Sequence, residues 1–170
     1  MAEKRRRRFD PHSIARWLRY ACYLVVLYSL WYFSSNFSFV RVLSGDDSVI
    51  GVTGRCSLVL AKYESDQVGP ERDEVVVFLM ADKDDNPVKR ISRVVAVPGD
   101  VVHGGDEFVE VNGEPTRYAA SQARLIEGRV PNGMYVMLND NPFSTFPDSR
   151  RMGFIPRQVI LGRLLCEAPF

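Results

Sequence analysis

The chain has 170 residues, 46% hydrophobic and 25% charged, and a formal net charge of +1 at pH 7. This composition suits one folded domain with a short appendage and excludes a disordered chain. Basic residues are concentrated in residues 4–19, where Asp10 is the only acid, so the rest of the chain offers no basic face for nucleic acid. With only His12 and His103 as histidines and no carboxylate cluster at ligand spacing, we expect no metal site and no cofactor.

An uncharged segment rich in aliphatic and aromatic residues follows the basic N-terminus. It runs from Tyr20 to Val40, and about 20 such residues cross a bilayer core as a helix. We therefore predict a basic segment over residues 1–19, a transmembrane helix over 20–40 and a separate domain over 41–170. A buried core helix and the apolar part of a cleaved secretory signal are the alternatives.

The distribution of arginines predicts the orientation of this helix. Arginines cluster before it and only Arg41 follows soon after, so the positive-inside rule keeps the N-terminus on the cis side. An Arg-rich, acid-poor N-terminus is also typical of mitochondrial import. We expect the mitochondrial inner membrane, with the N-terminus in the matrix and residues 41–170 in the intermembrane space. The endoplasmic reticulum or the plasma membrane is the alternative location.

The remaining residues are predicted to be mostly β. Short runs of β-branched and aromatic residues are divided by turn signals, and Asn112-Gly113 is typical of a type I′ hairpin. No long helical pattern appears after residue 41. The expected strands are Ser57–Tyr63, Glu74–Met80, Ile91–Val97, Phe108–Val111, Gly133–Leu138 and Val159–Leu165.

Three blocks of this domain form a recognisable series. They are Arg72–Phe78, Ser92–Asp100, and Val130–Asn141 running on to Asp148-Ser149-Arg150. In this order and at these distances they resemble the type I signal peptidases, and within them the mitochondrial inner membrane peptidase subunits. The resemblance covers roughly residues 38–167. It implies a mostly β domain of several small antiparallel sheets, preceded by one N-terminal transmembrane helix.

The resemblance also implies a serine–lysine endopeptidase, in which a neutral lysine takes the proton of an attacking serine. The family writes the second block Lys-Arg-Val-Ile-Gly-Leu-Pro-Gly-Asp, so the slot of the base lysine is Ser92 here. A seryl hydroxyl cannot replace an amine as the base. Lys89 lies three positions earlier, and in a strand this odd offset puts it on the opposite face unless a bulge intervenes.

The nucleophile position is also altered. The family places it in a Gly-x-Ser-Met-x-Pro turn just after the anchor, where Ser48 is the candidate in an exposed turn, with Val49 for methionine and Gly51 for proline. If Ser44-Gly45-Asp46 is aligned with the family instead, Asp47 falls in the nucleophile slot. A serine in a turn with Gly and Asp is also explained by ordinary turn chemistry.

The scaffold positions match the family better than the chemical ones. They comprise the turn Pro98-Gly99-Asp100, the pair Asp140-Asn141 with Asn139 for glycine, and Asp148-Ser149-Arg150. The resemblance implies that Asp148 and Arg150 form a structural ion pair and that Ser149 orients the base.

The departures from the family pattern are concentrated at the positions of the base and the nucleophile. This distribution predicts a catalytically degenerate protein. We expect a structural or accessory subunit of a mitochondrial inner-membrane assembly, with the membrane and the other subunits of the complex as its partners. The alternative is an active serine endopeptidase that removes presequences, with Ser48 and Lys89 as its catalytic pair. A third hypothesis is a module that binds extended precursor peptides without cutting them.

Overall fold

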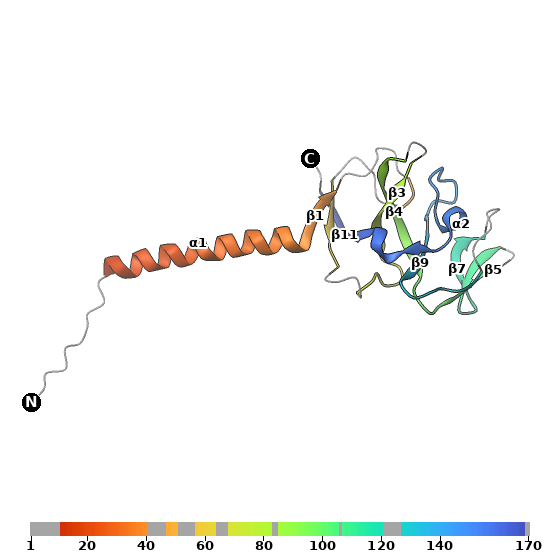
Figure 1. The fold of residues 1–170 in the computed structure, drawn as a ribbon, viewed down its shortest axis with the longest axis horizontal. Coiled ribbons are helices and arrows are strands. Elements are labelled where there is room, and N and C mark those ends of the chain that lie inside the picture. The colour runs from red at the N-terminus through yellow and green to blue at the C-terminus, as the bar shows by residue number, and fades with distance from the viewer. Residues whose placement is uncertain are drawn as a thin grey trace, which may run out of the picture. The chain divides into compact units, whose positions relative to one another are not determined.

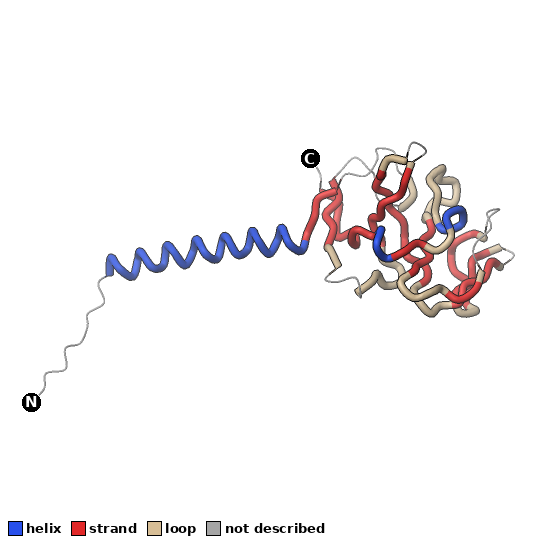
Figure 2. Tube along the Cα trace, viewed as in Figure 1, coloured by secondary structure: helices blue, strands red, loops and turns tan. Residues whose placement is uncertain are grey.

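A computed structural model describes residues 11–40, 47–50, 57–63, 68–82, 85–105, 107–120 and 127–168. The chain divides into two units, residues 1–36 and residues 37–170. Helix α1 (Pro11–Asn36) belongs to the first unit, and the second is a β domain with two short helical turns (Figures 1 and 2). The mostly β fold predicted from the sequence is confirmed.

The bounds of the N-terminal helix differ from the prediction. Residues 11–19 are already helical, and the helix ends at Asn36 rather than at residue 40. The segment Phe37–Val40 forms strand β1, because its alternating side chains pair with strand β2 (Ser57–Ala61) in an antiparallel ladder. The β domain therefore starts at Phe37 and not at residue 41.

The prediction that this helix crosses a membrane is not supported by its hydropathy. Among the described residues, no helix is both long enough and apolar enough to do so. In α1 tyrosines and serines such as Tyr20, Tyr28 and Ser29 interrupt the aliphatic residues.

Two antiparallel sheets build the β domain. The larger has seven strands in the order β1-β2-β11-β3-β4-β9-β10, and the smaller has four in the order β7-β6-β5-β8. In Figure 1, β5 and β7 lie together at one end of the β domain, away from β1 and β11. The remaining bounds are β3 (Val75–Ala81), β4 (Pro87–Ala96), β5 (Val101–Gly104), β6 (Phe108–Val111), β7 (Glu114–Ala119), β8 (Gly128–Arg129), β9 (Met134–Leu138), α2 (Ser149–Met152), β10 (Ile155–Pro156), the 3₁₀ turn η1 (Arg157–Val159) and β11 (Ile160–Ala168).

Strand β4 connects the parts of the core. Its residue Ile91 packs in one cluster with Val77 of β3 and Leu60 of β2. After the register shift with β9 between Val94 and Ala96, its last residues pack against the smaller sheet. A strand that touches both sheets is well placed to hold a site at their junction.

The two turns predicted from the sequence are formed. Asn112 and Gly113 have φ values of 56° and 82°, as a type I′ hairpin between β6 and β7 requires. In the turn Pro98-Gly99-Asp100, Gly99 has φ of 93°, and its N–H donates to the carbonyl of Val130 at 2.9 Å.

We expect Gly99→Val to lower the free energy of unfolding by about 1–3 kcal/mol, because a β-branched residue is strained at this φ. A Cβ at Gly99 would meet no atom within 4 Å, so the cost comes from the backbone alone. Denaturant unfolding measures it. Gly104→Ala is the matched control, since φ there is not in the left-handed range and its Cβ would lie at an ordinary 3.5 Å from Glu127 Oε1. Equal losses in the two variants would contradict this account.

Candidate functional site

The position of the base slot is fixed by the ladder between β3 and β4. Ser92 pairs with Val76 and Lys89 with Leu79, and the register is regular from Pro87 to Arg93. Ser92 is 1% exposed, whereas Lys89 is exposed to solvent. No bulge in this stretch turns Lys89 toward Ser92, so the structure does not bring Lys89 to the base slot.

The hydroxyl of Ser92 is held by an amide. Its Oγ donates to Asn139 Oδ1 at 2.6 Å, and Asn139 Nδ2 in turn donates to the carbonyl of Phe146 at 2.8 Å. Asn139 is 3% exposed. Within the described part of the chain, Asn139 is the only hydrogen-bond partner of the Ser92 side chain, and it has no proton-accepting group that titrates near neutral pH.

Ser48 is buried rather than exposed, which corrects the sequence prediction. It is 1% exposed, because the neighbouring Val49 packs into the core with Val40 and Leu60. Its Oγ lies 3.4 Å from the Oγ of Ser144. Its carbonyl accepts the N–H of Asp140 at 2.7 Å, which fixes this segment against the end of β9.

The alternative alignment lies mostly outside the described residues, since Ser44, Gly45 and Asp46 are not among them. Asp47 is described and exposed, and its carboxylate accepts a hydrogen bond from Asn141 Nδ2 at 2.9 Å. The resulting contact links Asn141 to the segment that carries Ser48.

Asp148 and Arg150 form a buried ion pair next to this segment. Arg150 Nη2 lies 2.6 Å from Asp148 Oδ2, and the two side chains are 8% and 5% exposed. Asp148 also caps α2 and accepts the N–H of Asn139 at 3.0 Å. Arg150 Nη1 donates to the carbonyl of Ala119 at 3.2 Å and so ties α2 to β7.

The side chain of Ser149 makes a hydrogen bond to the backbone of β9. Its Oγ accepts the N–H of Met137 at 2.8 Å, and the residue is 1% exposed. This bond joins α2 to β9, so the hydroxyl that the resemblance assigns to orienting a base carries a structural contact here.

Asp100 closes the turn after β4 in a similar way. Its carboxylate accepts the N–H of Val97 at 2.8 Å and a short ion-paired hydrogen bond from Arg72. The contact joins the first and second sequence blocks, and Pro98 and Gly99 lie within the turn that it closes.

Asp140 is the centre of a charged network between the two sheets. It accepts two hydrogen bonds from Arg93, at 2.7 and 2.9 Å, and one from the hydroxyl of Tyr118 at 3.0 Å. Burial is the largest single influence and raises the pKa of Asp140, but the hydrogen bonds and charge of Arg93, the hydrogen bond from Tyr118 and the charge of Arg117 together outweigh it, so this pKa lies below its ordinary value. Burial and the nearby Asp140 carboxylate raise the pKa of Tyr118, which therefore stays a donor at neutral pH.

Sequence reasoning assigned no role to several residues of this site. Arg90 lies on the same face of β4 as Ser92, is 7% exposed, and places its guanidinium 4.0 Å from the centre of the Phe146 ring. Asn139 was visible only as a substitution for glycine. Ser144 and Arg117 carried no sequence signal, because Ser48 and Asp140, the residues of this site that they contact, lie far away in the chain.

Comparison with known proteins identifies the family. The sequence profile described as signal peptidase, peptidase S26, matches residues 14–167. The chain belongs to this family.

Two curated proteins named as signal peptidases are similar to this chain. The chain is 35% identical over 113 residues to the probable signal peptidase I-2 of Synechocystis sp., which covers 62% of this chain and 51% of the relative. It is 33% identical over 103 residues to the signal peptidase I of Leptolyngbya laminosa, covering 55% and 50% respectively. The chain thus spans about half the length of the curated relatives it matches. A solved signal peptidase I from Enterococcus faecalis V583 has 23% sequence identity and a TM-score of 0.42, over 58% of this chain and 98% of that one.

Proposed function

We propose that this signal peptidase family member is catalytically degenerate and acts as a structural or accessory subunit of a membrane assembly. One observation carries the proposal: the base slot holds Ser92, whose buried hydroxyl donates to Asn139 at 2.6 Å. General-base catalysis at neutral pH needs a group that can accept and release a proton there, and neither a hydroxyl nor an amide does.

The size of the two side chains supports the same proposal. The family resemblance gives lysine and glycine at the slots of Ser92 and Asn139. Replacing lysine by serine shortens one side chain, and replacing glycine by asparagine lengthens its neighbour. The hydrogen bond between them shows that Asn139 occupies the space beside Ser92. The slot is therefore packed and satisfied, which favours retention of the fold for a purpose other than cleavage.

The second candidate function is an active endopeptidase that acts on precursor peptides. The observation that favours it is the fixed position of Ser48, whose carbonyl accepts from Asp140 and whose hydroxyl lies 3.4 Å from Ser144. Its weakness is Lys89, which is exposed on the far side of β4 from Ser92.

In cells from which the gene for this protein has been deleted, we expect the double variant Ser48→Ala/Lys89→Met to complement the deletion. Precursor processing should continue at the normal rate. If the protein does not cleave precursors, removing the candidate nucleophile and base changes no cleavage rate. Because Ser48 is buried, losing its hydrogen bond costs about 1 kcal/mol, so protein levels must be matched. N-terminal sequencing of mitochondrial proteins measures processing. Accumulation of uncut precursors at normal protein levels would establish the peptidase instead.

We also propose that α1, although its hydropathy does not mark a membrane span, anchors the protein in the mitochondrial inner membrane, with the N-terminus in the matrix and the β domain in the intermembrane space. The support is the exposure of large apolar side chains along α1, such as Trp17 at 73% and Leu24 at 68%, together with the arginines that precede it.

Protease added to mitoplasts should digest the β domain and spare a tag at the N-terminus. Immunoblotting shows whether the tag and the β domain are digested or protected. In the control, detergent opens the mitoplasts and both are digested. Loss of both without detergent would place α1 on the membrane surface, and protection of the β domain would reverse the orientation.

A further inference from the structure

The chain contains two asparagines that are followed by glycine, Asn112-Gly113 and Asn132-Gly133. In such a pair the backbone nitrogen of glycine can attack the side-chain carbonyl carbon of asparagine, because glycine has no Cβ to obstruct the approach. A bond forms between this nitrogen and this carbon, and the amide group leaves as ammonia with the proton of the glycine N–H. Water then opens the resulting succinimide ring. The product is aspartate, or isoaspartate when the backbone is left running through the side-chain carbon.

The amide of Asn112 is held by hydrogen bonds on both of its atoms. Its Oδ1 accepts the N–H of Val101 at 2.8 Å, and its Nδ2 donates to Asp100 Oδ1 at 3.1 Å. The backbone N–H of Asn112 also donates to the carbonyl of Val101 at 2.8 Å. The side chain therefore cannot turn toward the nitrogen of Gly113 until these bonds break.

The asparagines outside the two pairs are each disfavoured for a separate reason. Asn86 and Asn141 precede proline, whose nitrogen carries no proton to give up. Asn139 is 3% exposed, and both atoms of its amide are hydrogen-bonded. Asn36 donates to the carbonyl of Tyr32 at 2.9 Å and is followed by phenylalanine, whose Cβ obstructs the attack.

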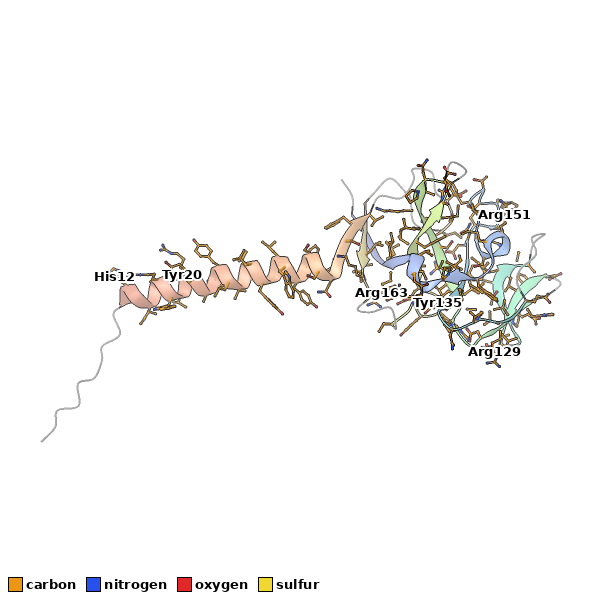
Figure 3. The ribbon with its side chains drawn as sticks, in the orientation of Figure 1. His12, Tyr20, Arg129, Tyr135, Arg151 and Arg163 are labelled. Carbon is orange, nitrogen blue, oxygen red and sulfur yellow. The ribbon has the colours of Figure 1, made fainter. Side chains whose placement is uncertain are left out.

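Asn132 lies in an exposed turn between β8 and β9. The N–H of Met134 closes this turn on the carbonyl of Pro131 at 3.1 Å, and Gly133 has φ of 72°. Among the described residues, neither the side chain of Asn132 nor the N–H of Gly133 makes a hydrogen bond. Arg129, which comes shortly before the turn, lies at the outer edge of the β domain (Figure 3). The two reacting groups of Asn132-Gly133 thus meet without losing a hydrogen bond of their own.

The geometry points to Asn132 as a site of spontaneous deamidation in the folded protein, with Asn112 protected although its neighbour is also glycine. The two products differ in their effect on the fold. Aspartate leaves the backbone unchanged, whereas isoaspartate inserts an extra carbon into it and displaces Gly133. The carbonyl of Gly133 accepts the N–H of Arg157 at 2.8 Å, so the isoaspartyl form loosens the contact between this turn and η1. The reaction needs only water and holds for a degenerate protein and an active one alike.

The test is to age the purified full-length chain at physiological pH and temperature and to follow it by tryptic digestion and mass spectrometry. The two pairs fall in different tryptic peptides, residues 94–117 and residues 130–150, so each is measured separately. Fragment ions assign the change from amide to carboxyl within residues 130–150 to Asn132. We expect this change to be at least about tenfold faster than at Asn112, where hydrogen bonds must break first.

The same chain unfolded in denaturant is the control for the protection of Asn112. Both peptides should then change at similar rates, because local sequence alone favours both pairs. Equal rates in the folded chain, or a faster change at Asn112, would overturn the proposal. A difference that persists in the unfolded chain would also overturn it, since the fold would not be its cause.

Asn132→Gln is the matched variant, because glutamine keeps an exposed amide but must close a larger and less favourable ring. It should abolish the change in residues 130–150. Methyl labelling by a protein isoaspartyl methyltransferase should mark the aged wild-type chain and not the aged variant, and hydrogen exchange at the Arg157 amide should rise only in the marked chain. Equal labelling of the two chains, or unchanged exchange at Arg157 in the marked one, would contradict the assignment. The comparison of the two peptides in the wild-type chain decides the matter even where the variant fails to fold.

Discussion

Arg150→Ala is expected to lower the free energy of unfolding by about 3–5 kcal/mol, because it leaves a buried carboxylate without its cation. Asp148 is 4% exposed, and Arg150 provides its closest contact, at 2.6 Å. The substitution also removes the donor to the carbonyl of Ala119 that joins α2 to β7. Denaturant unfolding followed by circular dichroism measures the loss.

The control for this variant is Arg151→Ala, which removes the adjacent, exposed arginine of the same short helix. Its cost should stay within about 0.5 kcal/mol. If Arg150→Ala cost no more than this control, the ion pair would contribute nothing to the fold. The effect is independent of catalysis, so it should appear whether or not the protein cleaves peptides.

Ser92→Lys is expected to destabilise the fold by about 3 kcal/mol or more, although it restores the residue type of the family. The position is 1% exposed and packed against Asn139, so the longer side chain must displace its neighbours and bury an ammonium group. The exposed Lys89→Ser, three residues earlier in the same strand, is the reciprocal control and should cost no more than about 0.5 kcal/mol.

Adding Asn139→Gly tests whether the two replacements are coupled. Removing the asparagine side chain makes room beside residue 92, so the double variant should be less destabilised than the sum of the two single variants. Additive losses would show that Asn139 does not fill the space that the lysine needs. A cleavage activity that arises only in the double variant would show that Ser48 still stands in a competent position.

Local sequence patterns predicted the parts of the fold that depend on neighbouring residues. The hairpin at Asn112-Gly113 and the strand Phe108–Val111 follow from turn chemistry and alternation. Strand β7 was missed because Glu114, Pro115 and Arg117 give it the composition of an exposed loop. Strand β1 was included in the helix because its apolar residues continue the apolar run of α1, and only its pairing with β2 separates the two.

At the candidate site, too, the sequence predicted only what depends on neighbouring residues. The odd offset between Lys89 and Ser92 predicted that only one of them faces the interior, and the regular ladder with β3 has that geometry. The partner of Ser92 could not be predicted, since Asn139 lies 47 residues away. The burial of Ser48 was predicted wrongly, because the surrounding Gly and Asp indicate a turn while the packing of Val49 into the core decides its exposure.

The order of the larger sheet has a consequence for synthesis of the protein on the ribosome. Strand β11 (Ile160–Ala168) follows the other described strands in the chain and lies between β2 and β3, so the pair β1–β2 has no backbone ladder to the rest of the sheet until this strand has been made. Pairings between such distant segments form slowly, and open strand edges recruit other chains in the meantime. A product that stops before Ile160 keeps two such edges permanently, which marks incomplete chains for chaperones and proteases.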